Sequence, residues 1–189
     1  MIFDGGGGIG DLRKKVEDQV SAHPYRSVRY WALFDSDAPA PGIRSTEATL
    51  AANACVKSGI KHHVLDRRAI ENYLPKGALY DWVSETPRKA AERRKKADAF
   101  YRLSPDQRAH FHVKSGFTKP PCEHERSLFK EVSELDRATL ASGVGKKVAE
   151  LYGTMDPRRL RSFVEKEGSD KELRPAIAEL IEMLRVPNG

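Results

Sequence analysis

Two aspartates follow a short apolar segment in the stretch WALFDSDAP, residues 31–39. Asp35 and Asp37 are two positions apart, and on an extended chain such residues point to the same side. Two carboxylates that lie so close repel each other unless a cation lies between them. The types and spacing of these residues therefore favour a site for a hard divalent cation, Mg²⁺ or Mn²⁺.

A second group of charged residues lies further along, in the stretch LDRRAIENYLP, residues 65–75. If this stretch is helical, Arg67 and Glu71 lie one turn apart on the same face. Glu71 can then be a third carboxylate ligand at the metal site. It can equally form an ion pair with Arg67 on the surface, which is a common and weakly stabilising arrangement. The sequence leaves both interpretations open.

The elements that must position these residues alternate between strands and helices. Short segments at 1–3, 30–34 and 60–65 predict strands, and the patterns at 11–22 and 45–58 predict the helices between them. A β-α-β-α-β order predicts a parallel sheet with right-handed crossovers. Both acidic stretches then begin where strands end, which is the edge at which open α/β sheets bind ligands.

Beyond Leu65 the pattern becomes helical. Helices are expected at 67–74, 76–100, 105–112, 126–140, 146–152, 157–166 and 171–184, with a loop containing proline and glycine at 113–125. Ser104 and Pro105 predict a helix that starts with an N-cap and a proline in its first turn. We therefore expect an α/β domain over residues 1–78 and a helical C-terminal region over residues 79–189.

The composition favours a protein that is soluble and binds a polyanion. Lys and Arg number 33 against 27 Asp and Glu, which gives a formal net charge of +6. Cys55 and Cys122 are the two cysteines, so the sequence indicates no disulfide framework and favours a reducing cytoplasm. No apolar segment approaches the roughly 18 residues of a membrane span, and we expect a cytoplasmic protein without a membrane partner.

A basic cluster lies in the stretch PRKAAERRKKADAFYR, residues 87–102. Its cations are Arg88, Lys89, Arg93, Arg94, Lys95 and Lys96. On one helix these side chains can follow a DNA backbone, which would make binding sensitive to salt. They can equally form an ordinary solvated helix face.

The pair LFDSDAP and LDRRAIENYLP resembles the later part of a TOPRIM domain, of the kind found in overcoming-lysogenization-defect (OLD) nucleases and related phage-defence effectors. The resemblance covers roughly residues 1–75. It matches Gly5 to Gly8 with the glycine-rich turn of the family, Asp35 and Asp37 with its Asp-x-Asp pair, and Glu71 with a further acidic residue. In the helical region, SPDQRAHFHVKSGF and GVGKKVAELYG are similar to segments of these proteins, which puts Lys146 or Lys147 near their catalytic lysine.

The family also carries a glutamate on a strand that precedes the glycine-rich turn, and this chain has no match for it. Asp4 precedes Asp35 by too few residues to hold the helix and strand that should lie between them. The resemblance therefore implies a partial TOPRIM-like (Rossmannoid) sheet that begins inside the domain. The chain would be a fragment, the product of a mis-started reading frame, or half of a split protein that an ATPase subunit or a second copy completes.

The resemblance implies that the protein is a metal-dependent DNA endonuclease that serves phage defence. Asp35, Asp37 and Glu71 would hold one or two Mg²⁺ or Mn²⁺ ions for phosphodiester hydrolysis. Lys146 or Lys147 would offset the charge that develops on the phosphate.

Two alternatives remain open from the sequence. The chain can be a non-catalytic DNA-binding or assembly subunit that retains a degenerate acidic site. It can also be a haloacid-dehalogenase-like phosphatase, in which the first aspartate of an Asp-x-Asp turn is a phosphoryl nucleophile. That turn normally follows the first strand of its domain, whereas a predicted strand and helix precede it here.

Overall fold

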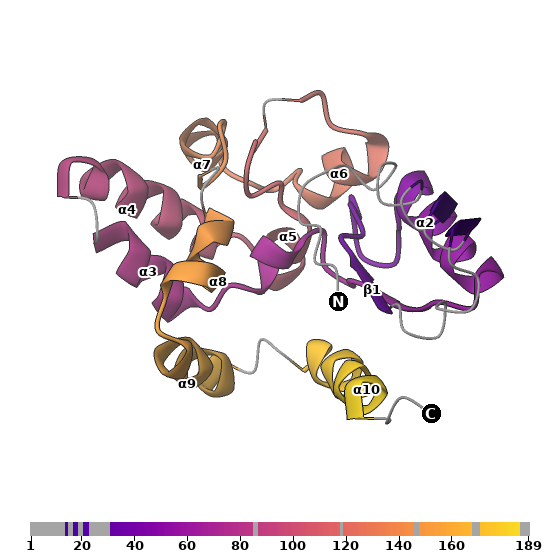
Figure 1. Cartoon of the computed structure of the whole chain (residues 1–189). Coiled ribbons are helices and arrows are strands. Elements are labelled where there is room, and N and C mark those ends of the chain that lie inside the picture. Colours follow the sequence, from indigo (N-terminus) through magenta and orange to yellow (C-terminus); the bar gives the residue numbers. More distant parts are fainter. Residues whose placement is uncertain are drawn as a thin grey trace.

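The computed structural model describes residues 31–84, 87–117, 119–145, 148–167 and 171–185, together with five residues near the N-terminus. Those five, Lys14, Glu17, Asp18, Ser21 and Ala22, are helical and belong to the helix expected at 11–22. The expected strand at 1–3 and the glycines at 5–8 lie outside the described residues. Figure 1 shows the strands and α2 at one end of the molecule and helices α3 and α4 at the other.

Two short strands form a parallel sheet. β1 (Trp31–Phe34) and β2 (Lys61–Val64) pair in parallel, with Trp31 opposite Lys61 and Phe34 opposite Val64. Helix α2 (Thr46–Lys57) connects them, and its N-cap Ser45 accepts a hydrogen bond from the Ala48 N–H at 3.1 Å. The predicted parallel strand-helix-strand unit is confirmed, and with it the α/β class.

A small apolar core lies between the sheet and α2. Its buried side chains are Phe34, Ala48, Ala51, Cys55, Ile60 and Val64. The small residues of α2 let the helix lie close to the short strands. Because this core is small, the position of the strand ends also depends on contacts with the rest of the chain.

The segment after β2 is not the helix that was expected at 67–74. It contains one short 3-10 helix, η2 (Ile70–Tyr73). The Asn72 side chain accepts a hydrogen bond from the Ala69 N–H, and it donates to the carbonyls of Arg108 and Phe111. These bonds to distant parts of the chain hold the segment in a conformation that a regular helix would not allow.

Several predicted helices are divided in the structure. The helix expected at 76–100 is two helices, α3 (Lys76–Ser84) and α4 (Pro87–Arg102), and the one expected at 126–140 is α6 (Glu123–Leu128) followed by α7 (Glu134–Thr139). Pro87 cannot continue a helix because it lacks a backbone N–H. Ser133 starts α7 as its N-cap, since its side chain accepts a hydrogen bond from the Asp136 N–H.

The remaining helices agree with the sequence pattern more closely. They are α5 (Pro105–His110), η3 (Val148–Glu150), α8 (Leu151–Thr154), α9 (Pro157–Glu167) and α10 (Leu173–Arg185). Ser104 caps α5 as predicted, and its side chain accepts from the Gln107 N–H at 3.2 Å. Among the described residues, no helix is both long and apolar enough to cross a membrane.

A second and larger core joins the helices. Its buried residues include Leu79, Trp82, Phe100, Phe111 and Leu151. It therefore combines α3, α4, α8 and the segments that connect α5 to η3. This core carries one wall of the candidate site described below, while the small core carries the other.

Of the two C-terminal helices, α9 contacts α3 and α10 contacts the sheet. Glu167, at the end of α9, accepts hydrogen bonds from the N–H groups of Lys76 and Gly77 at 2.7 and 3.1 Å. Glu179 on α10 pairs with Lys61 of β2 at 3.1 Å. The two regions expected on either side of residue 78 are thus joined by hydrogen bonds and ion pairs.

Candidate functional site

Asp35 and Asp37 follow β1 but lie in different surroundings. Asp35 is half-buried, and its Oδ1 accepts a hydrogen bond from the Ile70 N–H at 3.0 Å. Asp37 is exposed, and its N–H donates to the carbonyl of Arg68 at 2.9 Å. The φ of Asp37 is 46°, in the left-handed region that Asp and Asn tolerate better than other non-glycine residues. The chain turns at Asp37, so the extended geometry assumed for the pair does not apply.

Ser36 holds the end of β1 against the segment that follows β2. Its side chain is fully buried, and its Oγ donates to the carbonyl of Arg67 at 2.7 Å and accepts from the Ala38 N–H at 3.2 Å. The Leu65 N–H also donates to the carbonyl of Phe34. These bonds place both predicted acidic stretches side by side at the carboxyl edge of the sheet.

Glu71 lies on η2 and is buried, with 3% of the residue exposed. Its Oε1 lies 2.6 Å from Nζ of Lys114. Of the two interpretations left open by the sequence, the surface pair with Arg67 is not formed, because Arg67 donates instead to the carbonyl of Asn72 and stacks on the ring of Tyr73. The expected helix that would have put Arg67 and Glu71 on one face is absent from this segment.

Four charged groups therefore interact at this edge, and we call them the acidic site: Asp35, Asp37, Glu71 and Lys114. Burial raises the pKa of Asp35 above its ordinary value, and the charges of Glu71 and Asp37 raise it further. The Ile70 hydrogen bond and the charge of Lys114 act in the opposite direction. Negative charge at Asp35 is thus only partly compensated, which is the condition under which an added cation stabilises a carboxylate.

Lys114 is the positive member of the acidic site. Burial alone would lower its pKa, but the hydrogen bond to Glu71 and the charges of Glu71, Asp35 and Asp37 raise it above the ordinary value. The ammonium is therefore firmly protonated. Its side chain is 48% exposed, so the ammonium can reach water or a ligand if another cation replaces it at Glu71.

Sequence reasoning did not single out Lys114, because it lies far from the acids along the chain. Tight packing positions its loop: a methyl group at Gly116 would come within 1.9 Å of the Leu140 carbonyl, and one at Gly143 within 2.4 Å of the Val113 carbonyl. Both glycines have positive φ. The one pointer in the sequence was the predicted resemblance of SPDQRAHFHVKSGF, which contains Lys114, to a segment of the nuclease family.

Lys146 and Lys147, the predicted catalytic lysines, lie outside the described residues. The element that follows them, η3, contacts η2. In the next helix, the Tyr152 hydroxyl donates to the carbonyl of Ile70 at 3.1 Å. The segment after these lysines therefore packs directly behind the residues that hold Asp35 and Glu71.

The carboxylates are not arranged as a ready metal site. Within the part of the chain that the structure describes, no group of three or more His, Cys, Asp or Glu side chains is placed to hold a metal ion. The oxygen ligands are nevertheless of the type that Mg²⁺ and Mn²⁺ prefer. For these acids to hold such an ion, Lys114 must leave Glu71 and the carboxylates must draw together.

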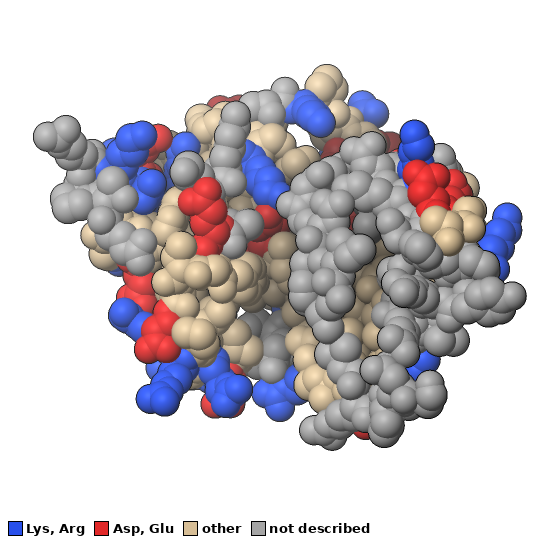
Figure 2. Space-filling view, viewed as in Figure 1, with Lys and Arg blue, Asp and Glu red and all other residues tan. Residues whose placement is uncertain are grey.

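The basic cluster lies on α4, and several of its charges have partners. Arg93 lies over the ring of Trp82 and Arg94 over that of Tyr80, at 4.1 and 4.5 Å from the ring centroids. Lys96 pairs with Glu92 at 3.3 Å. Lys89 and Lys95 are exposed, and the side chain of Arg88 lies outside the described residues. In Figure 2, Lys and Arg side chains gather at the left edge, where Figure 1 places α4, with acidic groups between them.

Comparison of the chain with protein-family models, with curated proteins and with solved structures finds no match. The TOPRIM resemblance stays a prediction that rests on the two acidic motifs. The structure itself confirms an α/β chain, predominantly helical, in which those motifs meet at one edge of a parallel sheet.

Proposed function

We propose that the protein is a metal-dependent DNA endonuclease of the TOPRIM type that acts in phage defence. The observation that carries this proposal is the buried Glu71 paired with the half-exposed Lys114, beside Asp35 at the carboxyl edge of the sheet. A buried carboxylate is costly unless it is paired. The site thus concentrates negative charge that one half-exposed ammonium balances, and a divalent cation could replace that ammonium.

Each residue of the acidic site would have a separate role in this reaction. Asp35, Asp37 and Glu71 would supply the oxygen ligands, and Mg²⁺ or Mn²⁺ held by them would supply a Lewis acid and a bound water for phosphodiester hydrolysis. Lys114, once released from Glu71, would offset charge on the phosphate at the same edge. Lys146 or Lys147 has that role by resemblance to the family, and the two assignments are compatible because more than one cation can contact a phosphate.

A second candidate is a non-catalytic DNA-binding or assembly subunit with a degenerate acidic site. The absence of a ready metal site among the described residues favours it, as does the Lys114–Glu71 ion pair, which already neutralises the buried carboxylate. In this case the basic face of α4 would contact DNA, and an ATPase subunit or a second copy of the chain would complete the site.

The haloacid-dehalogenase-like phosphatase is less well supported. Its nucleophile needs a carboxylate oxygen that is free to attack phosphorus. One oxygen of Asp35 is engaged by the Ile70 N–H instead.

Nicking of supercoiled plasmid in Mg²⁺ and in Mn²⁺ tests the proposal. We expect the wild-type protein to nick the plasmid. Asp37→Asn and Glu71→Gln should each lower the nicking rate at least about 100-fold, because each replaces one charged metal ligand and changes no other charge. Asn suits position 37 because it tolerates the left-handed conformation. Asp66→Asn is the matched control, since Asp66 is an exposed aspartate at the end of the neighbouring strand.

Each outcome of this experiment decides between the two candidates. Nicking that persists in Asp66→Asn and is lost in the other two variants supports the endonuclease. A wild-type protein that binds DNA but nicks it in neither metal overturns the endonuclease and supports the binding subunit.

A further inference from the structure

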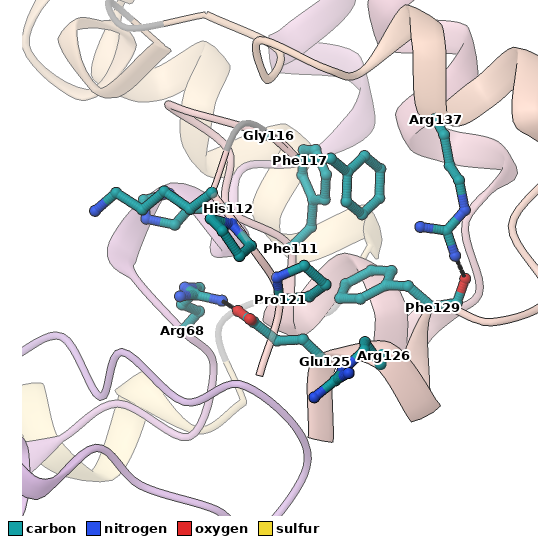
Figure 3. Close-up of a pocket in the computed structure, with 12 residues that line it drawn as sticks. Arg68, Phe111, His112, Gly116, Phe117, Pro121, Glu125, Arg126, Phe129 and Arg137 are labelled. Carbon is teal, nitrogen blue, oxygen red and sulfur yellow. Dashed lines mark hydrogen bonds and ion pairs between the residues drawn. The ribbon is translucent and has the colours of Figure 1, made fainter. Parts of the chain in front are cut away.

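A cavity of about 210 Å³ opens beside the acidic site. Figure 3 shows its wall of phenylalanines, to which Phe111, Phe117 and Phe129 contribute. The ring of Phe117 packs edge-on against those of Phe111 and Phe129, with centroids 5.2 and 5.3 Å apart. Phe111 and Phe129 are buried, while Phe117 is partly exposed. We call this space the phenylalanine cavity.

The charged side chains around the phenylalanine cavity are mainly cationic. They are Arg68, Lys119, Arg126 and Arg137, against the single carboxylate of Glu125. Arg68 pairs with Glu125 at 2.5 Å, and Arg137 donates to the carbonyl of Phe129. Lys119 and Arg126 are exposed, and neither pairs with an acid in the described part of the chain. The rim thus presents positive charge that an anionic ligand can neutralise.

His112 adds a neutral polar group to the wall. Burial lowers its pKa, and the charge of Arg68 lowers it further. The imidazole is therefore uncharged at neutral pH, when one ring nitrogen donates a hydrogen bond and the other accepts one. Nucleobase edges combine donors and acceptors in the same way.

The phenylalanine cavity adjoins the acidic site, although Asp35, Asp37, Glu71 and Lys114 do not line it. The Asp37 N–H donates to the carbonyl of Arg68, whose side chain lines the cavity. His112 and Lys114 flank Val113, so the segment that carries the cavity wall also carries the ammonium at Glu71. The charge of Asp37 opposes the lowering of the His112 pKa, so the two groups lie close enough to interact.

We propose that the phenylalanine cavity binds an unpaired nucleobase of the DNA strand whose phosphate lies at the acidic site. This inference rests on the proposed function, and it narrows the substrate to single-stranded DNA or to duplex in which a base has left the stack. Aromatic rings combined with a cationic rim are how proteins hold single strands. A base inside a duplex cannot enter such a cavity without being extruded.

The test measures binding in EDTA, so that hydrolysis has no part in it. Fluorescence anisotropy with the full chain compares a labelled single-stranded oligonucleotide, the duplex of the same length, and the single strand with abasic positions that keep the sugar-phosphate backbone. We expect the intact single strand to bind roughly tenfold more tightly than either of the others, because stacking on one aromatic side chain is worth about that much.

Two variants locate the effect in the phenylalanine cavity. Phe117→Leu keeps most of the volume but removes the ring, so it should bind intact and abasic strands equally. Lys119→Ala with Arg126→Ala should weaken binding of both strands and reduce the salt dependence, by about one unit of slope for each phosphate that the protein no longer neutralises. Lys130→Ala, an exposed lysine paired with Glu131, is the matched control and should bind as the wild type does.

The outcomes separate this inference from the proposed function. Equal binding of intact strand, abasic strand and duplex by the wild type overturns the base site even if plasmid is nicked. Base-dependent binding that Phe117→Leu abolishes supports the base site even if plasmid is not nicked. If free dAMP displaced the labelled strand at the same concentration as unlabelled oligonucleotide does, the ligand would be a mononucleotide and not a DNA strand.

Discussion

Glu71 and Glu172 are two carboxylates at the segment that follows β2, and they are satisfied in different ways. Glu71 is buried and has the flexible ammonium of Lys114 as its ion-pair partner. Glu172 accepts from the Asp66 N–H at 2.8 Å and from the Tyr73 hydroxyl, and it lies 2.9 Å from Nε2 of His63. The partners of Glu172 are a backbone N–H and side chains fixed by the sheet and by η2. The partner of Glu71 is a half-exposed side chain that can be exchanged.

This difference distinguishes a structural carboxylate from one that can bind a ligand. Glu172 joins the start of α10 to the sheet, and no cation could replace its backbone partner without breaking the fold. The partner of Glu71 is instead a half-exposed side chain, which a metal ion could replace without removing a backbone hydrogen bond of Glu71. We therefore expect changes at Glu172 to affect stability alone, and changes around Glu71 to affect both stability and chemistry.

The largest expected loss of stability comes from Lys114→Ala. It leaves the Glu71 carboxylate buried without its cation, which costs about 3 kcal/mol in the free energy of unfolding. Urea unfolding at neutral pH measures this loss. Adding Glu71→Gln to Lys114→Ala should restore most of it, because the uncompensated charge is then gone. If single and double variants are equally stable, the ion pair contributes nothing and the contrast with Glu172 fails.

Mg²⁺ sharpens the same prediction. In Lys114→Ala the ion has no competing ammonium at Glu71, so adding Mg²⁺ should raise the midpoint of thermal unfolding more than in the wild-type protein. An equal response of both proteins to Mg²⁺ would contradict the view that a metal ion can replace Lys114.

A smaller effect is expected from Glu172→Ala. It removes the acceptor of the Asp66 N–H and the Tyr73 hydroxyl, which lowers the free energy of unfolding by about 2 kcal/mol. Nicking measured below the unfolding temperature should stay at the wild-type rate. Glu179→Ala is the control, because its exposed pair with Lys61 is worth well under about 1 kcal/mol. Loss of nicking as large as that of Glu71→Gln would place Glu172 in the reacting site.

The smallest change in the free energy of unfolding is expected from Asp35→Asn, which should stabilise the protein where the other variants destabilise it. The folded pKa of Asp35 is raised above its ordinary value of 3.8. The folded state therefore binds the proton more tightly, and stability falls as pH rises from about 3.8 through the folded pKa. Asp35→Asn removes this penalty, so the variant should be more stable than wild type at pH 7 and equally stable at pH 3. Denaturant unfolding at the two pH values checks this, and a variant that is less stable at pH 7 would contradict it.

Elements with local signals were predicted well. The WALF strand is a short apolar segment, the strand at 61–64 lies between Ile60 and Leu65, and α2 between the strands has a serine N-cap and a glycine after its C-terminus. Gly59 there has a φ of 65°, which glycine adopts without strain. Ser104 and Pro105 likewise start α5 where the capping pattern placed them.

Elements that depend on distant partners were not predicted. The segment 67–74 has a helical pattern, yet the Asn72 side chain binds carbonyls of Arg108 and Phe111. Neither partner is recognisable from the local sequence. Pro87, in contrast, is a local signal for a helix break, and the prediction of a single helix over 76–100 overlooked it.

The acidic site shows the same division. Two motifs that contain acids, each beginning at or after a short strand, were enough to predict that Asp35 and Glu71 lie at one sheet edge, because parallel strands end on the same side. Only the tertiary structure paired Glu71 with Lys114 rather than Arg67, since the loop of Lys114 is set by close packing of Gly116 against the 140–143 turn. Strand and helix patterns depend on neighbours along the chain, whereas the partner of a buried charge depends on which distant segment packs against it.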